Sequence, residues 1–287
     1  MLRLTDVRKR FGRVTAVDGL SLDVAAGEVM GLLGPNGAGK TTTIGMAVGL
    51  LHPDAGTVTL GEGTGLGSPA DPRMRMLIGV APQEIALYEA MTARENLVLF
   101  ARLHGLGRHD AKRRAGELLD GIGLADRAHH RVSGFSGGMK RRLNLAAALV
   151  GEPKLVLLDE PTAGVDPQSR NAIFDIVARL KDAGVTVLFS THYMEEAARL
   201  CDRVAIVDHG RLLALGTVGE LIETHGGPSM VVVRRHGQDE ERTATSTPLD
   251  ELSRLIAEKG PTIAELRIEK PDLEAVFLSL TGREHRH

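Results

Sequence analysis

The sequence feature that most constrains this chain is a glycine-rich segment that ends in a lysine and a threonine. It follows the apolar run 29–33 and fits the pattern G-x-x-x-x-G-K-[ST], which is typical of phosphate-binding loops. In such a loop a strand leads in and a helix leads out, so backbone N–H groups surround an anion at the positive end of the helix dipole. The residues predicted to bind a nucleotide here are Gly34, Pro35, Asn36, Gly37, Ala38, Gly39, Lys40, Thr41 and Thr42.

Separate tasks are expected for the parts of this loop. The glycines let the backbone turn tightly and approach phosphate without a Cβ in the way. Lys40 is expected to pair with the β- and γ-phosphates, and the hydroxyl of Thr41 to hold Mg²⁺. The alternative is a glycine-rich turn that precedes a lysine by chance, and the strand and helix patterns on either side disfavour it.

The size and composition of the chain predict one large α/β unit and a smaller addition. It has 287 residues, of which 43% are hydrophobic, enough for a sizeable core. The formal net charge of -2 gives no electrostatic argument for binding nucleic acid or an acidic membrane surface. No apolar run approaches the roughly 18 residues of a membrane span, so we expect a soluble chain whose membrane role, if any, needs a partner. The single cysteine, Cys201, is expected to be a buried apolar residue.

The order of hydrophobic patterns predicts how the chain is organised. Alternating segments at 2–4 and 20–24 predict antiparallel strands near the N-terminus. Short apolar strands separated by helical patterns then predict a parallel sheet that is covered on both faces. Residues 85 to about 150 form a helical insertion in this scheme. Residues 221–229 are predicted to be a linker, and residues 230–287 a small β/α accessory domain.

Two carboxylates follow a buried strand and are candidates for catalysis. Asp159 and Glu160 come directly after the apolar run 155–158, at the strand end where open α/β sheets bind ligands. Asp159 is expected to complete the Mg²⁺ shell through water, and Glu160 to orient or deprotonate an attacking water. An acidic turn at the end of a strand is the alternative, which the phosphate-binding loop in the same chain disfavours.

A second glycine-rich helix start lies near residue 136. Ser136 precedes Gly137 and Gly138 and then an amphipathic helical pattern, so Ser136 is predicted to be the helix N-cap. The two glycines leave N–H groups open at the positive helix end. Alone this is a capped helix. Together with the phosphate-binding loop, it gives the chain two helix starts that can bind an anion.

Six segments together resemble the motifs of the ATP-binding cassette (ABC) family. In chain order they are similar to its Walker A, glutamine loop, signature, Walker B, D-loop and switch histidine, and they are Gly34–Thr41, Gln83, Phe135–Met139, Leu155–Glu160, Ala163–Asp166 and Ser190–His192. The resemblance covers about residues 2 to 220 and implies an ABC ATP-binding domain at 1–220. The fold it implies is α/β: a P-loop NTPase (RecA-like) core with an N-terminal antiparallel β subdomain, a helical insertion and a small C-terminal β/α appendage.

The resemblance also implies a homodimer with ATP between its subunits. In that family the Walker A loop of one cassette and the signature of the other enclose each ATP. Ser136, Gly137 and Gly138 would therefore contact the γ-phosphate bound to the opposite subunit. Asp166 would lie at the dimer seam.

Three further roles follow from the same resemblance. His192 is expected to contact the γ-phosphate and to be catalytic with Glu160. Gln83 is expected to sense Mg²⁺ and the attacking water and to connect the site with the helical insertion. Phe11 occupies the place of an aromatic residue that stacks on adenine, although an ordinary core phenylalanine is the alternative. The implied metal ligands are thus Thr41, Gln83 and Asp159, and the implied cofactors are ATP and Mg²⁺.

Short markers resemble the exporter branch that includes daunorubicin-resistance ATPases. They are segments 86–97, 135–143 and 273–278, although Phe135 and Met139 replace the common Leu and Gln of the signature. Proteins of this branch work with a separate multi-span permease. We therefore expect an ATPase subunit on the cytoplasmic face of a cell membrane, from a bacterial source, that drives export of drug-like, antibiotic or lipid/polysaccharide cargo.

Two other classes of function stay open at this point. A soluble ABC ATPase acting on DNA or ribosomes usually carries tandem cassettes, a long coiled coil or zinc-binding cysteines, which this chain lacks. A nucleotide-binding regulator without hydrolysis is disfavoured by Glu160 and His192. The basic runs 8–10 and 140–142 are interpreted as solvated faces, because neither is interleaved with aromatic residues that stack on bases. No nucleic-acid partner is therefore expected.

Overall fold

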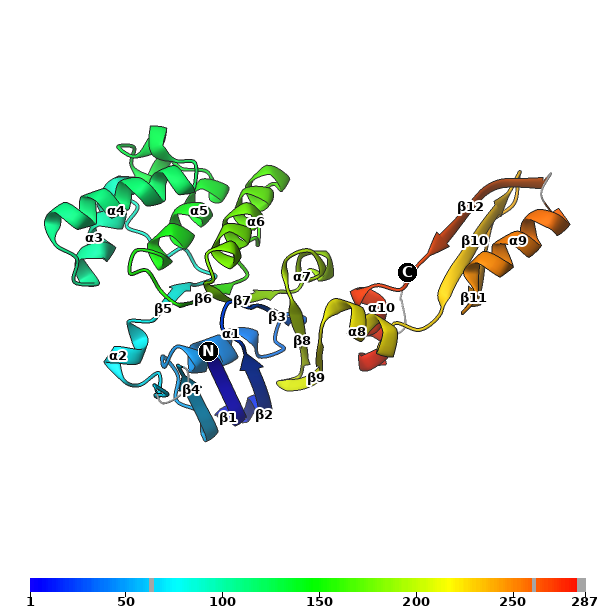
Figure 1. Cartoon of the computed structure of the whole chain (residues 1–287), viewed down its shortest axis with the longest axis horizontal. Helices are drawn as coiled ribbons and strands as arrows, with labels where there is room; N and C mark the ends of the chain where they lie inside the picture. Colours follow the sequence, from blue (N-terminus) through cyan, green and yellow to red (C-terminus); the bar gives the residue numbers. More distant parts are fainter. Residues whose placement is uncertain (62–64, 260–261, 283–287) are drawn as a thin grey trace. The chain divides into compact units, whose positions relative to one another are not determined.

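The chain folds into two compact units, Met1–Leu215 and Gly216–His287. The computed structural model describes residues 1–61, 65–259 and 262–282 (Figure 1). The predicted accessory domain thus includes residues 260–261 and 283–287, which lie outside the described residues. Among the described residues, no helix combines the length and the apolar character needed to cross a membrane.

The large unit is built on a mainly parallel sheet with the strand order β5-β6-β7-β3-β8-β9. These strands are β3 (Val29–Leu33), β5 (Ile78–Ala81), β6 (Leu155–Asp159), β7 (Thr186–Thr191), β8 (Arg203–Asp208) and β9 (Arg211–Gly216). Every residue of β3, β6 and β7 is buried, as expected for strands covered on both faces. The parallel register pairs Asp159 with Ser190 and Leu33 with Thr191. The carboxyl ends of three neighbouring strands therefore meet at one edge.

One face of this sheet packs against the N-terminal subdomain. There β1 (Leu2–Phe11) pairs antiparallel with β2 (Val14–Val24) and β4 (Ala55–Leu60). Helix α1 (Lys40–Ala47) shares one hydrophobic core with both sheets. Figure 1 shows α1 beside β1 and β4. The helix ends at Ala47, and Gly49 adopts a φ of 74° just beyond it.

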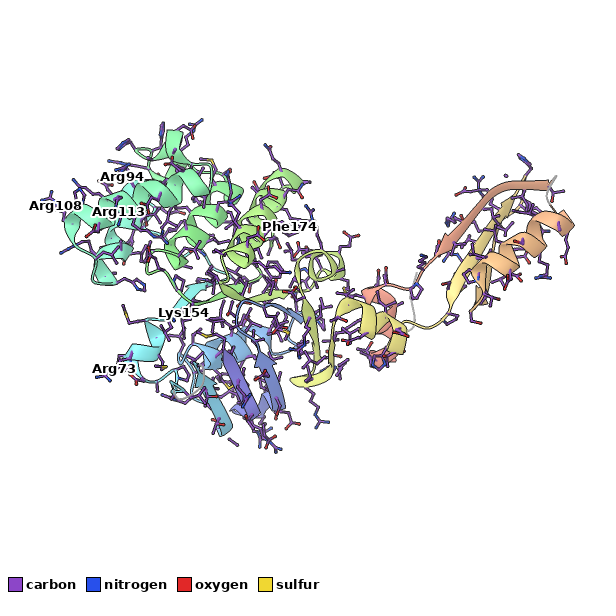
Figure 2. The ribbon with its side chains drawn as sticks, in the orientation of Figure 1. Arg73, Arg94, Arg108, Arg113, Lys154 and Phe174 are labelled. Carbon is purple, nitrogen blue, oxygen red and sulfur yellow. The ribbon has the colours of Figure 1, made fainter. Side chains whose placement is uncertain are left out.

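The other face of the sheet is covered by helices. They are α3 (Ala93–Leu103), α4 (Arg108–Gly121), α5 (Gly137–Ala148) and α6 (Pro167–Asp182), with the shorter helix α7 (Met194–Leu200) and the 3₁₀ turns Ala125–Arg127 and Val132–Gly134. The short helix α2 (Pro72–Arg75) instead packs its Met74 against the core shared with the N-terminal subdomain. A capping box of Thr92 and Glu95 starts α3. Figure 1 shows α3, α4 and α5 grouped together, and Arg94, Arg108 and Arg113 project from this group in Figure 2. One apolar core joins these helices to Val156, Leu158 and Phe189 of the sheet.

The described part of the smaller unit contains a three-stranded antiparallel sheet and three helices. The sheet has the strand order β11-β10-β12, with β10 (Ser229–Arg235), β11 (Glu240–Thr245) and β12 (Ile263–Glu269). The helices are α8 (Val218–His225), α9 (Pro248–Lys259) and α10 (Leu273–Thr281). Leu255 of α9 packs against Val231 and Val233 of β10. Helices α8 and α10 pack against each other.

The prediction of a linker at 221–229 differs from the structure, because most of this stretch lies in α8. A capping box starts the helix: Thr217 Oγ1 accepts from Glu220 N, and Glu220 Oε2 accepts from Thr217 N. Leu221 is only 3% exposed, so the helix also buries an apolar residue. The glycines at 226 and 227 that suggested a linker lie beyond the helix end.

The structure predicts that Phe189, fully buried in β7, contributes strongly to stability. Phe189→Ala should lower the free energy of unfolding of the large unit by about 3–5 kcal/mol, because the lost contacts leave a cavity. Leu50→Ala is the control, since Leu50 is 77% exposed, and it should change this energy by less than about 0.5 kcal/mol. Urea denaturation of both variants measures the difference, and equal midpoints would contradict the prediction.

Candidate functional site

The predicted phosphate-binding loop runs from the end of β3 to the start of α1. A Cβ on Gly34 would lie 2.2 Å from the carbonyl oxygen of Val207. Gly39 has a φ of 99°, and a Cβ there would lie 2.4 Å from the carbonyl oxygen of Ala16. These two positions therefore require glycine. Among the residues that the structure describes, no side chain caps the N-terminus of α1, which leaves its first N–H groups available to an anion.

Lys40 is held across this loop and is nearly buried. Its Nζ donates to the carbonyl oxygens of Gly34 at 2.7 Å and Pro35 at 3.0 Å. The same Nζ lies 3.0 Å from Glu160 Oε1, and the two side chains are 5% and 8% exposed. Because a buried charge is costly without partners, this arrangement fixes the position of the ammonium group.

Asp159 and Glu160 lie at the end of β6 and are both fixed by Ser190 of β7. Ser190 Oγ donates to Asp159 Oδ1 at 2.6 Å and accepts from the backbone N–H of Glu160 at 3.0 Å. Glu160 has a φ of 45°, in the left-handed region that residues other than glycine seldom adopt. Such strain persists where the surrounding structure holds it, often at functional sites.

The structure brings His192 to the same carboxylate. His192 Nδ1 lies 3.2 Å from Glu160 Oε2, while Lys40 approaches Oε1. The imidazole ring also lies 4.0 Å from the ring of Tyr193, measured between centroids. Three residues that are far apart in the sequence thus meet around one carboxyl group.

A cavity of about 380 Å³ opens in front of the loop, within the size range of small-molecule sites. It is lined by Val14, Thr15, Ala16, Asn36, Gly37, Gly39, Lys40, Thr41, Thr42, Gln83 and Glu160. Phe11 is not among these residues. It is 48% exposed, with Lys9 Nζ 5.7 Å from its ring centroid, so the alternative of a core phenylalanine is wrong.

The predicted signature residues do not line this cavity. Ser136 caps α5, since its Oγ accepts from Met139 N at 3.3 Å. Gly137 has open space where a Cβ would be, whereas a Cβ on Gly138 would lie 1.9 Å from the Oγ of Ser169. The close packing of α5 on α6 therefore requires glycine at 138.

Asp166 caps the neighbouring helix α6. Its carboxylate accepts from the backbone N–H of Ser169 at 2.9 Å and from the Ser169 hydroxyl at 2.7 Å. These hydrogen bonds, that to the backbone first, lower the pKa of Asp166 below its ordinary value. The exposed carboxylate thus stays ionised at the start of the helix.

Sequence reasoning missed two contributions to the site. Ser190 belongs to the segment Ser190–His192 that resembles the switch-histidine motif, but its bonds to β6 depend on strand register. Arg141 of α5 donates to the carbonyl oxygen of Gln83, and Arg142 donates to that of Ile122 at 2.7 Å. Burial lowers the pKa of Arg141. The stretch 140–142, interpreted as a solvated face, is therefore partly exposed, and both arginines also bind backbone carbonyl groups.

Comparisons with known proteins identify the family. The family model described as ABC transporter matches residues 17–163. The chain is 40% identical to the linearmycin resistance ATP-binding protein LnrL of Bacillus subtilis, with 100% of both chains covered. It is 43% identical to the daunorubicin/doxorubicin resistance ATP-binding protein DrrA of Streptomyces peucetius, over 96% of this chain and 90% of that protein. The chain therefore belongs to the ABC transporter family.

Solved structures agree with this assignment. An ATP-binding subunit of an ABC transporter superposes with a TM-score of 0.70 at 32% identity, covering 79% of this chain and 93% of that one. The cassette MJ0796, described as dimeric in a post-hydrolysis state with ADP and Pi, gives 0.68 at 26% identity, covering 76% and 98%. The predicted fold class is confirmed. The chain is an ATP-binding, ATP-hydrolysing subunit of an ABC transporter.

A first prediction concerns Gly34, which lacks space for a side chain. Gly34→Ala should displace the loop and weaken nucleotide affinity about tenfold or more, because the new Cβ cannot occupy the position of the Val207 carbonyl. Gly121→Ala is the matched control, since nothing lies within 4 Å of a Cβ there. Titration with a fluorescent ATP analogue compares the two variants, and equal affinity would exclude the steric argument.

A second prediction concerns Ser190. Ser190→Ala removes the hydroxyl that orients Asp159 and the backbone of Glu160, and kcat for ATP hydrolysis should fall about tenfold. The affinity for ATP should change by less than about twofold, because Ser190 does not line the cavity. Ser253→Ala, in the smaller unit, provides the control. An unchanged kcat would show that Ser190 does not position the carboxylates.

Proposed function

We propose that the chain hydrolyses MgATP as one subunit of a homodimer that drives a separate membrane permease of an exporter. The observation that carries the proposal is the convergence of Lys40, Glu160 and His192 beside a cavity formed by the phosphate-binding loop. The arrangement contains a cation for phosphate, a carboxylate for water and an imidazole next to that carboxylate. These are the groups that phosphoryl transfer to water requires.

Lys40 and Glu160 exchange partners in this mechanism. A bound triphosphate competes with Glu160 for the ammonium group of Lys40, which is 3.0 Å from the carboxylate. When Lys40 pairs with phosphate, Glu160 becomes available to orient and deprotonate a water molecule. His192, whose Nδ1 lies 3.2 Å from Glu160 Oε2, would contact the γ-phosphate and hold the reacting geometry.

The oxygen donors near the loop fit Mg²⁺. Thr41 and Gln83 line the cavity, and Asp159, at the end of β6, accepts a hydrogen bond from Ser190. Oxygen ligands suit Mg²⁺, which also takes phosphate and water ligands. Bound there, Mg²⁺ would neutralise phosphate charge. Thr41, Gln83 and Asp159 would hold it.

A second copy of the chain completes the site in this proposal. Ser136, Gly137 and Gly138 lie at the start of α5 and do not line the cavity of their own chain. The dimeric MJ0796 cassette supports the idea that a partner supplies them. Asp166 is exposed and can lie at the seam between subunits. Phe11 is exposed enough to stack on adenine.

Closure of the dimer couples ATP to transport. ATP contacts both subunits only in the closed state, so its binding energy favours closure, and hydrolysis removes that preference. The bond from Arg141 to the Gln83 carbonyl connects the site with the helical insertion, the proposed surface for the permease. The relatives support export: besides the two resistance proteins, the chain is 42% identical to the Nod factor export ATP-binding protein I of Burkholderia lata, with 97% and 96% coverage.

The export assignment places the chain at the cytoplasmic face of a bacterial membrane. Its cargo would be a drug-like compound, an antibiotic, a lipid or a polysaccharide. The alternative of a soluble ATPase acting on DNA or ribosomes finds no support in the names of these relatives.

Glu160→Gln tests the proposal, because it removes the base but keeps the shape of the side chain. ATP hydrolysis should fall at least about 100-fold, and the variant should accumulate as a dimer with bound MgATP. Glu152→Gln is the matched control: Glu152 also has a positive φ, but its side chain is 76% exposed and far from the loop. Hydrolysis near the parent rate in Glu160→Gln would remove the residue from its role.

The same variant can identify the partner. Tagged Glu160→Gln, purified from its native cells with MgATP and mild detergent, should carry a multi-span membrane protein that lacks its own cassette. Mass spectrometry identifies the co-purifying chains. Recovery only with ribosomes or DNA would overturn the transport proposal.

A further inference from the structure

A buried glutamate outside the predicted site, Glu196, connects two of its loops. Glu196 lies on α7 and is 2% exposed. Its Oε2 accepts from the hydroxyl of Thr162 at 2.9 Å and from the hydroxyl of Thr191 at 2.7 Å. Both threonines are 1% exposed. A buried carboxylate is costly, so the structure must hold these bonds in place.

The two threonines occupy decisive positions in the chain. Thr162 lies two residues after Glu160 and directly before the segment 163–166, which is expected at the dimer seam. Thr191 directly precedes His192, and its Oγ1 also accepts from the backbone N–H of Tyr193 at 3.0 Å. Glu196 is thus bonded to the start of one loop and to the base of the other.

Helix α7 is itself attached to α6, which starts at Asp166. Arg199 of α7 donates to Asn171 Oδ1 of α6 at 2.9 Å. Its guanidinium also lies 4.8 Å from the ring centroid of Phe174, which is labelled on α6 in Figure 2. A displacement of α6 is therefore transmitted to α7 and to Glu196.

The second oxygen of Glu196 lacks a hydrogen bond among the described residues. Arg170 Nε of α6 lies 3.6 Å from Glu196 Oε1, too far for a good hydrogen bond, and neither buried atom has a hydrogen-bond partner. The guanidinium of Arg170 lies 5.4 Å from the ring centroid of Tyr193, the neighbour of His192. A shift of less than about 1 Å would make this ion pair a hydrogen bond.

We infer that Glu196 is a positioning residue that couples the seam segment 163–166 to His192. When a second subunit docks on this segment, the displacement of Thr162 and α6 moves the carboxylate of Glu196 toward Arg170. Because Thr191 is bonded to the same oxygen, His192 moves with it. The inference rests on the proposed function, since it assigns His192 to ATP hydrolysis in a closed dimer.

Valine substitutions of the threonines test this link, because valine keeps the shape of threonine and removes the hydroxyl. Thr162→Val should lower kcat about tenfold and leave KM for ATP within about twofold. Thr191→Val should do the same. The double variant should be no slower than the slower single variant, since breaking either bond already breaks the link. Thr162→Ser, which keeps the hydroxyl, should restore kcat to within about twofold of the parent.

Thr186→Val is the matched control, because Thr186 is equally buried at the opposite end of β7 and its hydroxyl accepts from Gly27 N. Its kcat should equal that of the parent. The inference is overturned if Thr162→Val and Thr186→Val have the same kcat, or if the losses of the two threonine variants multiply in the double variant. If Glu160→Gln loses hydrolysis and one of these two results is also found, the proposed function stands and only the inference about Glu196 is overturned.

Discussion

The parallel pairing of β3, β7 and β6 is the constraint on which the site depends. Its register sets Asp159 beside Ser190 and Leu33 beside Thr191, so the residues that follow these strands emerge next to one another. The phosphate-binding loop, the acidic pair and His192 all follow such strand ends. Because the strands are buried on both faces, their register cannot slip without exposing apolar side chains.

Buried charge is the second principle of this site. Lys40 and Glu160 are almost fully buried, and each compensates the other, with carbonyl oxygens taking the remaining donors of Lys40. Burying such an ion pair costs desolvation free energy that a pair of apolar residues would not, which is expected for charged groups that are needed for catalysis. Glu196 is another buried carboxylate. Two threonine hydroxyls donate to its Oε2, and its Oε1 lies 3.6 Å from Arg170 without a hydrogen bond among the described residues.

The starts of three helices differ in a way that matches their proposed tasks. Helix α1 begins after Gly39 without a side-chain cap, so its N–H groups remain for phosphate. Helices α5 and α6 begin with Ser136 and Asp166, whose side chains satisfy part of their own helix ends. The start of α1 lines the cavity of its own chain, whereas the start of α5 does not. The proposed mechanism therefore needs the α5 start of a second subunit.

The phosphate-binding loop, the cap at Ser136 and the alternation of strands and helices in the large unit follow from the sequence alone, because glycine geometry, caps and apolar periodicity are local properties. The family follows from the resemblance of six ordered motifs to those of known ABC proteins. The sequence could not show that Ser190 holds Asp159, that Arg141 bonds the Gln83 carbonyl, or that Glu196 joins two loops. It also predicted a linker where the capping box of Thr217 and Glu220 starts a helix. The tertiary structure decided these points, because strand register and helix packing bring together side chains that are distant in the sequence.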